Sequence, residues 1–267
     1  MNDGIPVSVH LSPRMPYGLL GKPRPILMPS ERVAFDPASI GDLFGWWDAS
    51  DISTLGPTSS GPGIVQANGP VKYLGDKSGN GWHLFQTGAD SASPTLLVSG
   101  LGGKSGLSFD GSDDQLFSSN TTPRIDQPYT IFAAVDIVNT AVSKFIFGCQ
   151  DRGFYAIITE AIQAYAGGAP TMTTTATGNT RAAIAVKVTP GVGGDAIWLG
   201  DSAAATTGTV SDTNLLTTGN ERLRLGATNT PNRFFSGRIY EIALFTSALS
   251  DSAILTMQRY LLAKYAI

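Results

Sequence analysis

The sequence has little of the chemistry on which many enzyme centres depend. Its 267 residues include one cysteine, Cys149, and two histidines, His10 and His83. A single cysteine excludes an internal disulfide framework, and its position in an apolar run predicts a small buried side chain. One cysteine and two distant histidines cannot form a closed zinc shell. No Gly-x-Ser-x-Gly motif accompanies His83, so we expect no nucleophilic serine there.

Charge and long apolar runs are also scarce. Charged residues make up 15% of the chain and the net charge is −3, which gives no general attraction to nucleic acid or to anionic membranes. The first thirty residues contain no uninterrupted apolar core, and no stretch approaches the length of a membrane span. We therefore expect no secretion signal, no nucleic-acid partner and no membrane partner.

The residues that are present favour an all-β protein with a substantial core. Hydrophobic residues make up 42% of the chain, and 31 glycines punctuate short runs rich in β-branched and aromatic residues. Such runs recur about every ten residues, which predicts an antiparallel sandwich of two sheets. The polar stretch 51–70 is predicted to be a loop, as is the threonine-rich stretch 167–179. The expected strands are 43–49, 71–74, 82–85, 94–98, 106–111, 115–117, 128–138, 144–149, 153–159, 161–166, 181–188, 222–227 and 234–245. A hairpin is expected over 195–203, with Gly200-Asp201 at its turn.

The C-terminal end predicts a strand followed by a capped helix. Both faces of residues 234–245 are apolar, which is typical of a central strand. Ser250 is a good N-cap, so a helix should begin near Asp251. Its apolar positions fall at helical spacing on one side, so the helix can lie against a sheet. These positions are Ile254, Met257, Leu261 and Tyr265.

Residues 1–40 differ from the rest of the chain. They hold seven of the sixteen prolines, which predicts an extended arm and not a helix. Apolar side chains lie between these prolines, and a solvated linker would have few of them. The arm either folds back on its own sandwich or docks on a neighbouring subunit. The side chains proposed for docking are Val7, Val9, Leu11, Tyr17, Leu19, Leu20, Ile26 and Leu27. The expected domains are this arm, 1–40, and a sandwich, 41–267.

Several motifs together resemble those of one fold family. They are Gly45-Trp-Trp-Asp-Ala-Ser-Asp, Asp76-Lys-Ser-Gly-Asn-Gly-Trp, Leu107-Ser-Phe-Asp-Gly-Ser-Asp-Asp-Gln-Leu and Gly237-Arg-Ile-Tyr-Glu-Ile, followed by Ala248-Leu-Ser-Asp. In this order they resemble concanavalin A-like, laminin G-like jelly-roll domains of the type attached to tailed-phage virion proteins. The resemblance covers about residues 41 to 267. It implies a two-sheet antiparallel jelly-roll sandwich with an N-terminal arm and a short C-terminal helix.

The resemblance also implies a function. The expectation is a non-enzymatic structural protein located in a phage virion, either a capsid decoration or head fibre or a tail or baseplate appendage. The arm would anchor it to other virion proteins, and we expect a homo-oligomer. One rival is a carbohydrate-binding adhesin domain that contacts a host-surface glycan. Another is a polysaccharide hydrolase or lyase, but hydrolases of this fold carry a Glu-x-Asp-x-Glu kind of triplet, and no such triplet surrounds Glu31, Glu160, Glu221 or Glu241.

Two kinds of binding residue are candidates. Asp110, Asp113 and Asp114 could offer oxygen ligands to calcium, as could Asp76 with Asn80, although the same sequences make tight turns without any metal. No other cofactor is expected. A glycan needs an exposed aromatic platform, for which the candidates are Trp47, Trp82, Trp198 and Tyr165, although aromatic side chains in a sandwich are often part of the core.

Overall fold

The structure is a computed structural model that describes most of the chain from Phe35 onward. The described residues are 35–119, 123–138, 144–149, 152–157, 161–166, 172–175, 180–191, 194–202, 205–208, 215, 221–228 and 233–267. Only the end of the predicted arm is among them, where Pro37–Ser39 form a short 3-10 helix, η1. The proposed docking residues lie outside the described residues: Val7, Val9, Leu11, Tyr17, Leu19, Leu20, Ile26 and Leu27.

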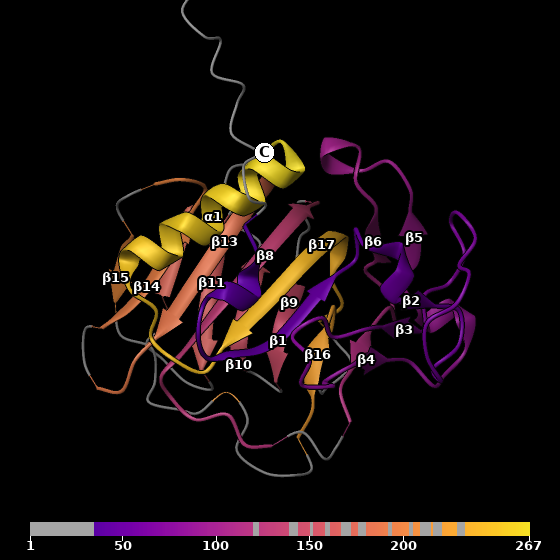
Figure 1. The fold of residues 1–267 in the computed structure, drawn as a ribbon, viewed down its shortest axis with the longest axis horizontal. Coiled ribbons are helices and arrows are strands. Elements are labelled where there is room, and N and C mark those ends of the chain that lie inside the picture. Colours follow the sequence, from indigo (N-terminus) through magenta and orange to yellow (C-terminus); the bar gives the residue numbers. More distant parts are fainter. Residues whose placement is uncertain are drawn as a thin grey trace, which may run out of the picture. The chain divides into compact units, whose positions relative to one another are not determined.

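Within the described part of the chain, the strands form two antiparallel sheets, as predicted (Figure 1). Eight strands make the first sheet, in which β1 (Leu43–Asp48) pairs with β17 beside the main path. The main path runs β15 (Thr206–Gly208), β14 (Asp195–Leu199), β13 (Thr180–Val188), β8 (Tyr129–Ile137), β17 (Ser236–Phe245), β6 (Gly106–Asp110) and β5 (Thr95–Leu97).

The second sheet has nine strands among the described residues. Its path runs β12 (Met172–Thr175), β11 (Ala161–Ala166), β10 (Arg152–Ile157), β9 (Lys144–Cys149), β16 (Leu223–Leu225), β7 (Leu116–Phe117), β4 (Leu84–Phe85), β3 (Tyr73–Leu74) and β2 (Leu55–Gly56). Several of these strands have only two or three residues, so the sheet depends on packing against the first sheet more than on its own ladder.

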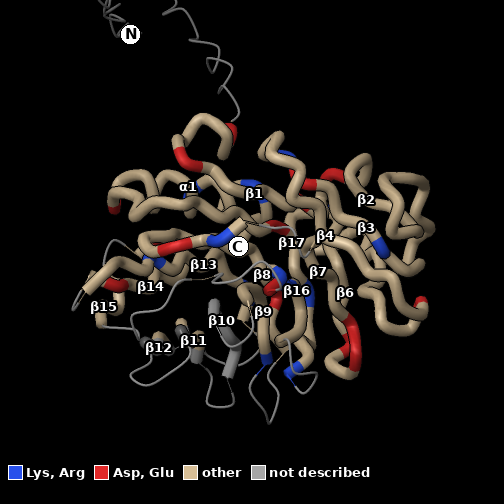
Figure 2. The backbone as a smooth tube through the Cα atoms, turned by 90° about the horizontal axis from the view of Figure 1, so that it is seen from below, with Lys and Arg blue, Asp and Glu red and all other residues tan. Residues whose placement is uncertain are grey.

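The described core has two parts, one on each side of the first sheet. The larger cluster lies between the sheets and includes Trp47, Ile131, Phe147 and Leu244. The smaller cluster lies between the outer face of the first sheet and the C-terminal helix α1 (Asp251–Tyr265), and includes Phe132. The helix therefore covers one face of the first sheet while the second sheet covers the other (Figures 1 and 2).

Strands β8 and β17 lie at the centre of this three-layer arrangement. All nine residues of β8 are buried, because its alternate side chains enter the two clusters in turn. One edge of β17 pairs with β8. Its other edge pairs with β6 over Ser236–Ile239 and with β1 over Glu241–Phe245. The prediction that 234–245 contains a central strand with two apolar faces is confirmed.

The C-terminal helix is also confirmed. The Ser250 hydroxyl accepts a hydrogen bond from the Ala253 N–H, as an N-cap does. Ile254, Met257, Leu261 and Tyr265 are all fully buried against the first sheet. Burying a large apolar side chain is worth about 1.5–3 kcal/mol, so this contact holds a helix that would fray alone. No helix in the described ranges combines the length and apolarity needed to cross a membrane.

Two stretches predicted as loops contain regular structure. The stretch 51–70 contains the 3-10 helix η2 (Ile52–Thr54) and the strand β2, which pairs with β3. The threonine-rich stretch contains β12, which forms an edge of the second sheet by pairing with β11. Its β-branched threonines suit a strand despite their polarity. Two further 3-10 turns are η3 (Asp90–Ala92) and η4 (Leu101–Gly103).

Candidate functional site

The tryptophans differ sharply in exposure, and this decides which can meet a ligand. Trp47 and Trp198 are 1% and 2% exposed, so the structure places both in the core and neither offers a ring face. Trp46 is also buried and donates its indole N–H to Glu241 at 2.7 Å. Trp82 is half-buried and remains a candidate platform. The side chain of Tyr165 lies outside the described residues.

Trp82 lines an aromatic pocket on the second sheet. The pocket has a volume of about 290 Å³ and is formed by β3, β4 and the loops that flank them. Phe44 stacks on the Trp82 ring, with centroids 5.4 Å apart and planes 2° apart, so the indole is fixed in orientation. The residues that line the pocket are Ser59, Tyr73, Gly81, Trp82, His83, Phe85 and Ser119. We refer to these seven residues as the aromatic pocket.

The turn at Asp76 holds one wall of the aromatic pocket in place. Its carboxylate accepts hydrogen bonds from the N–H groups of Trp46 at 2.9 Å, Ser78 at 2.8 Å and Trp82 at 3.0 Å. The amide of Asn80 donates to the carbonyl of Phe44 at 3.0 Å. Asp76 bonds its own turn as predicted, whereas Asn80 bonds β1 instead. Because both Asp76 oxygens accept N–H groups, this carboxylate serves the turn and not a cation.

His83 has a defined tautomer in this wall. Its Nδ1 accepts a hydrogen bond of 3.0 Å from the N–H of Asp76, so Nδ1 carries no proton and the proton of the neutral ring lies on Nε2. The ring packs against Tyr73, with centroids 5.2 Å apart. Burial, followed by the charge of Asp76, raises the pKa of Tyr73, so this phenol stays a neutral donor. The pocket thus combines aromatic faces with polar hydrogen atoms.

The predicted calcium candidates do lie together. Asp110, Asp113 and Asp114 can bring one carboxylate oxygen each within 4.8 Å of the others. However, Asp114 accepts the Asp110 N–H at 2.8 Å, and Asp110 accepts the Ser112 N–H at 2.7 Å. These are the bonds of a tight turn at the end of β6, and they give Asp110 and Asp114 a role in that turn that needs no metal.

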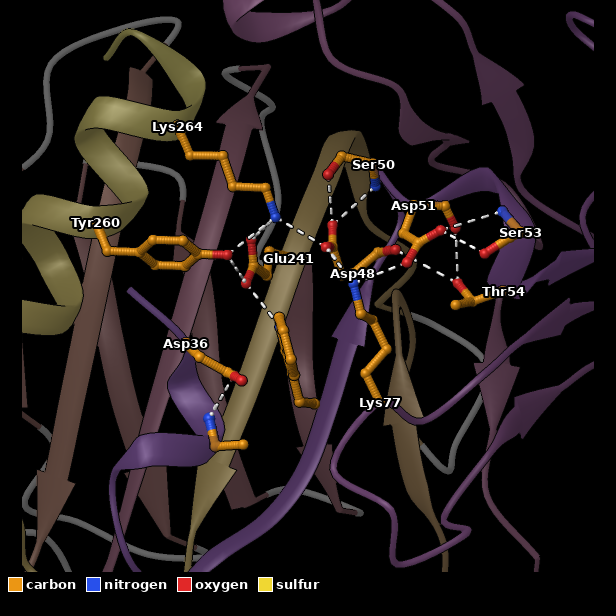
Figure 3. Close-up of polar contacts among 12 residues, drawn as sticks. Asp36, Asp48, Ser50, Asp51, Ser53, Thr54, Lys77, Glu241, Tyr260 and Lys264 are labelled. Atoms are coloured by element: carbon orange, nitrogen blue, oxygen red, sulfur yellow. Dashed lines mark hydrogen bonds and ion pairs between the residues drawn. The ribbon is translucent and has the colours of Figure 1, made fainter. Parts of the chain in front are cut away.

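A second polar cluster was not predicted from the sequence. Asp48 and Glu241 face each other across the β1–β17 pair, and Lys264 of α1 binds Asp48 at 2.8 Å and Glu241 at 2.7 Å (Figure 3). Tyr260 donates its hydroxyl to Glu241 at 3.0 Å. Lys77 binds Asp48 at 3.1 Å. Glu241 is therefore one of a carboxylate pair, although no Glu-x-Asp-x-Glu triplet surrounds it in the sequence.

The electrostatics of this buried cluster separate the two carboxyl groups. Burial raises the pKa of Glu241, and the charge of Asp48 adds to that effect. Burial also opposes ionisation of Asp48, but Lys264, Ser50 and Lys77 outweigh it and lower its pKa. The two side chains are only 4% and 0% exposed, so no substrate can reach them. The cluster ties the helix to the first sheet and is not a catalytic pair.

The structure also places the single cysteine. Cys149 is fully buried, which confirms the prediction of a small core side chain, and its Sγ lies 3.7 Å from Glu221. His10 lies outside the described residues. Sequence reasoning found Trp82 but missed Tyr73, Phe85, Ser59 and Ser119, because strands distant in sequence bring them to one pocket.

No protein-family model matches this sequence, and the comparison with curated proteins found no match. Solved structures are similar to it. The sialidase of Trypanosoma rangeli has a TM-score of 0.53 at 13% identity, over 84% of this chain and 33% of the sialidase chain. Domain 4 of AbnA, a GH43 extracellular arabinanase from Geobacillus stearothermophilus solved in complex with arabinotriose, has a TM-score of 0.52 at 13% identity, over 81% of this chain and 98% of that domain.

At these identities the likeness establishes the fold: a mostly β chain with two antiparallel sheets, of a kind found in glycoside hydrolases. The chain spans about one third of the sialidase that it matches. The expectation of a non-enzymatic structural protein of a tailed-phage virion is contradicted, because these similar structures belong to carbohydrate-active enzymes. The expectation that the protein is not an enzyme is contradicted by the same finding. The order of the motifs correctly indicates two packed sheets, but a resemblance in fold does not determine function.

Proposed function

We propose that this chain is the saccharide-binding sandwich of a carbohydrate-active enzyme, and that its sheets form a concanavalin A-like jelly roll. The aromatic pocket carries the proposal. Sugar-binding sites present aromatic faces to the C–H groups of a sugar ring and polar groups to its hydroxyls, and this pocket has both. Further support comes from domain 4 of the arabinanase, which was solved in complex with arabinotriose.

The pocket geometry suits a single sugar unit at the end or in the middle of a chain. Its volume of about 290 Å³ lies near the lower limit of small-molecule sites, about 300 Å³. The fixed ring of Trp82 supplies a platform that needs no ordering on binding, because Phe44 already holds it. The Nε2–H of His83 can donate to a hydroxyl oxygen. Specificity would therefore come from hydroxyl positions around a stacked ring.

The test is a titration of the full chain with arabinotriose and with a panel of other neutral oligosaccharides. Binding is monitored through the indole N–H signals in 1H–15N spectra. Trp82 is the half-buried tryptophan, whereas Trp46, Trp47 and Trp198 are buried. We expect a binding sugar to shift the Trp82 signal and to leave those of Trp46 and Trp198 unchanged. The Trp47 indole donates to the Trp82 carbonyl at 2.8 Å, so its signal is not used as a reference. A shift confined to the buried indoles, or no shift with any sugar, would contradict the proposal.

Substitution of Trp82 gives the second readout. Trp82→Ala should weaken binding about tenfold or more, which corresponds to about 1.4 kcal/mol. Ile64→Ala is the matched control, because Ile64 is 85% exposed and does not line the aromatic pocket. Circular dichroism and thermal melting of each variant verify that the fold is retained. Equal affinity in the two variants would place the sugar elsewhere.

A further inference from the structure

A polar pocket lies on the outer face of the first sheet, beyond the C-terminal end of helix α1. Its volume is about 300 Å³, and its lining includes Gly100, Asp136, Arg181, Arg238, Tyr240 and Ala266. We refer to it as the arginine pocket. It shares no lining residue with the aromatic pocket. Tyr240 packs against Tyr265, the last residue of the helix, with ring centroids 5.4 Å apart, so the end of α1 forms a wall.

Strand register brings three charged side chains to this pocket. Asp136 of β8 pairs with Arg181 of β13 on one side and with Arg238 of β17 on the other. Directly paired residues on adjacent strands share a face, with Cβ atoms about 4.5–5.5 Å apart. The neighbouring outward-facing residues Ala134 and Ala183 belong to the cluster under the helix. This row of three charged residues therefore lies just beyond the part of the sheet that α1 covers.

The charges in this row do not balance. Arg238 Nη1 lies 2.7 Å from Asp136 Oδ2, whereas Arg181 Nε lies 3.9 Å from the same oxygen and is too distant for a hydrogen bond. Two guanidinium groups thus share one carboxylate and leave one positive charge. Their side chains are 41% and 65% exposed, while that of Asp136 is 8% exposed. Each guanidinium carries five N–H donors, and a single carboxylate cannot accept them all.

We propose that the arginine pocket binds the carboxylate of an acidic saccharide unit. A guanidinium presents two parallel N–H groups that match a planar carboxylate, and Arg181 is free to present them because its bond to Asp136 is not formed. Asp136 makes the pocket selective among anions. Its negative charge lies close to the bound anion, so it repels a phosphate dianion more strongly than a carboxylate monoanion. That the ligand is a saccharide rests on the proposed function; the anion site rests on the geometry described above.

The experiment titrates the full chain with the methyl glycosides of glucuronic, galacturonic and N-acetylneuraminic acid. The neutral methyl glucoside, sodium acetate and inorganic phosphate serve as comparisons. We expect one acidic glycoside to shift the backbone amides of Arg181 and Arg238, and its affinity to fall as salt is raised. The methyl glucoside should not shift them. Equal binding of acetate would overturn the saccharide assignment, and preferential binding of phosphate would overturn the carboxylate assignment.

Substitutions separate this site from the aromatic pocket. Arg181→Gln should weaken the acidic glycoside about tenfold or more, and it preserves the Arg238–Asp136 ion pair, so the fold is retained. Arg259→Gln removes an exposed arginine from helix α1 and should leave affinity unchanged. Trp82→Ala should leave binding at the arginine pocket unchanged while it weakens neutral sugar binding at the aromatic pocket. Unaltered affinity in Arg181→Gln would overturn the inference, whatever the result at Trp82.

Discussion

At the scale of single residues, the environment of Asp114 makes the stability of the protein depend on pH. Burial, opposed by a hydrogen bond from the Asp110 N–H and reinforced by the charges of Asp110 and Asp113, raises its pKa from 3.8 to about 6. The folded protein therefore holds this proton more tightly than the unfolded chain does. The contribution of this group to stability is present below pH 3.8, and it is lost as the pH rises through about 6.

We predict that Asp114→Asn raises the melting temperature at pH 7.5 and has little effect at pH 4. Asparagine keeps an oxygen that can accept the Asp110 N–H, but it cannot ionise. Thermal melts from pH 4 to 7.5 measure the difference between the variant and the unaltered chain. A difference independent of pH would contradict the prediction. If 5 mM calcium chloride raised the melting temperature of the unaltered chain only, the three aspartates would be a metal site.

At the scale of elements, helix α1 is held by its cap and by the buried cluster beneath it. We predict that Ser250→Ala lowers the free energy of unfolding by about 0.5–2 kcal/mol, because the Ala253 N–H loses its acceptor. Thr256→Ala, on the exposed side of the same helix, should be neutral or slightly stabilising because alanine is the better helix former. Urea denaturation compares the two variants. Equal costs for Thr256→Ala and Ser250→Ala would show that the loss of stability is not specific to the cap.

A larger loss of stability is expected when the buried cluster loses its lysine. Lys264→Met should cost about 3–5 kcal/mol, because Asp48 and Glu241 would face each other without the cation that binds both. Since the pKa of Glu241 is already raised by burial and by Asp48, the loss should grow as the pH rises and both carboxyl groups ionise. Adding Glu241→Gln to Lys264→Met should recover part of the loss. Urea denaturation at pH 5 and pH 8 gives both comparisons, and a loss that is equal at the two pH values would refute this account.

The sequence predicts helix α1 and most strands, but it does not predict which side chains of the first sheet the helix buries. Period-two patterns correctly indicated most strands, and Ser250 with the spacing of Ile254, Met257, Leu261 and Tyr265 indicated the helix and its buried side. The exposure of the tryptophans could not be predicted, because α1 covers the outer face of the first sheet and buries both sets of alternating side chains. Trp198 on that face is as buried as Trp47 on the inner face. Asp48 and Glu241 lie far apart in sequence, and no local pattern relates them.

At the scale of the whole molecule, residues 35–267 form one compact unit. Phe35 packs against Tyr260 of the helix, with ring centroids 5.2 Å apart, so the sandwich should be cut before this residue. We predict that residues 35–267 alone fold with an unchanged melting temperature and unchanged circular dichroism. The matched control begins at residue 41 and lacks the Phe35 contact; it should melt at a lower temperature. Failure of residues 35–267 to fold would show that the preceding segment contributes to the core.

The pairing of β1 with β17 has a consequence during synthesis. Residues 43–48 are translated nearly 200 residues before their partner strand, 236–245. Until then β8 lacks its neighbour on one side, and its apolar faces are not buried by the complete sheet. We therefore expect fragments that end before residue 245 to expose the apolar faces of β8 and to be prone to aggregation.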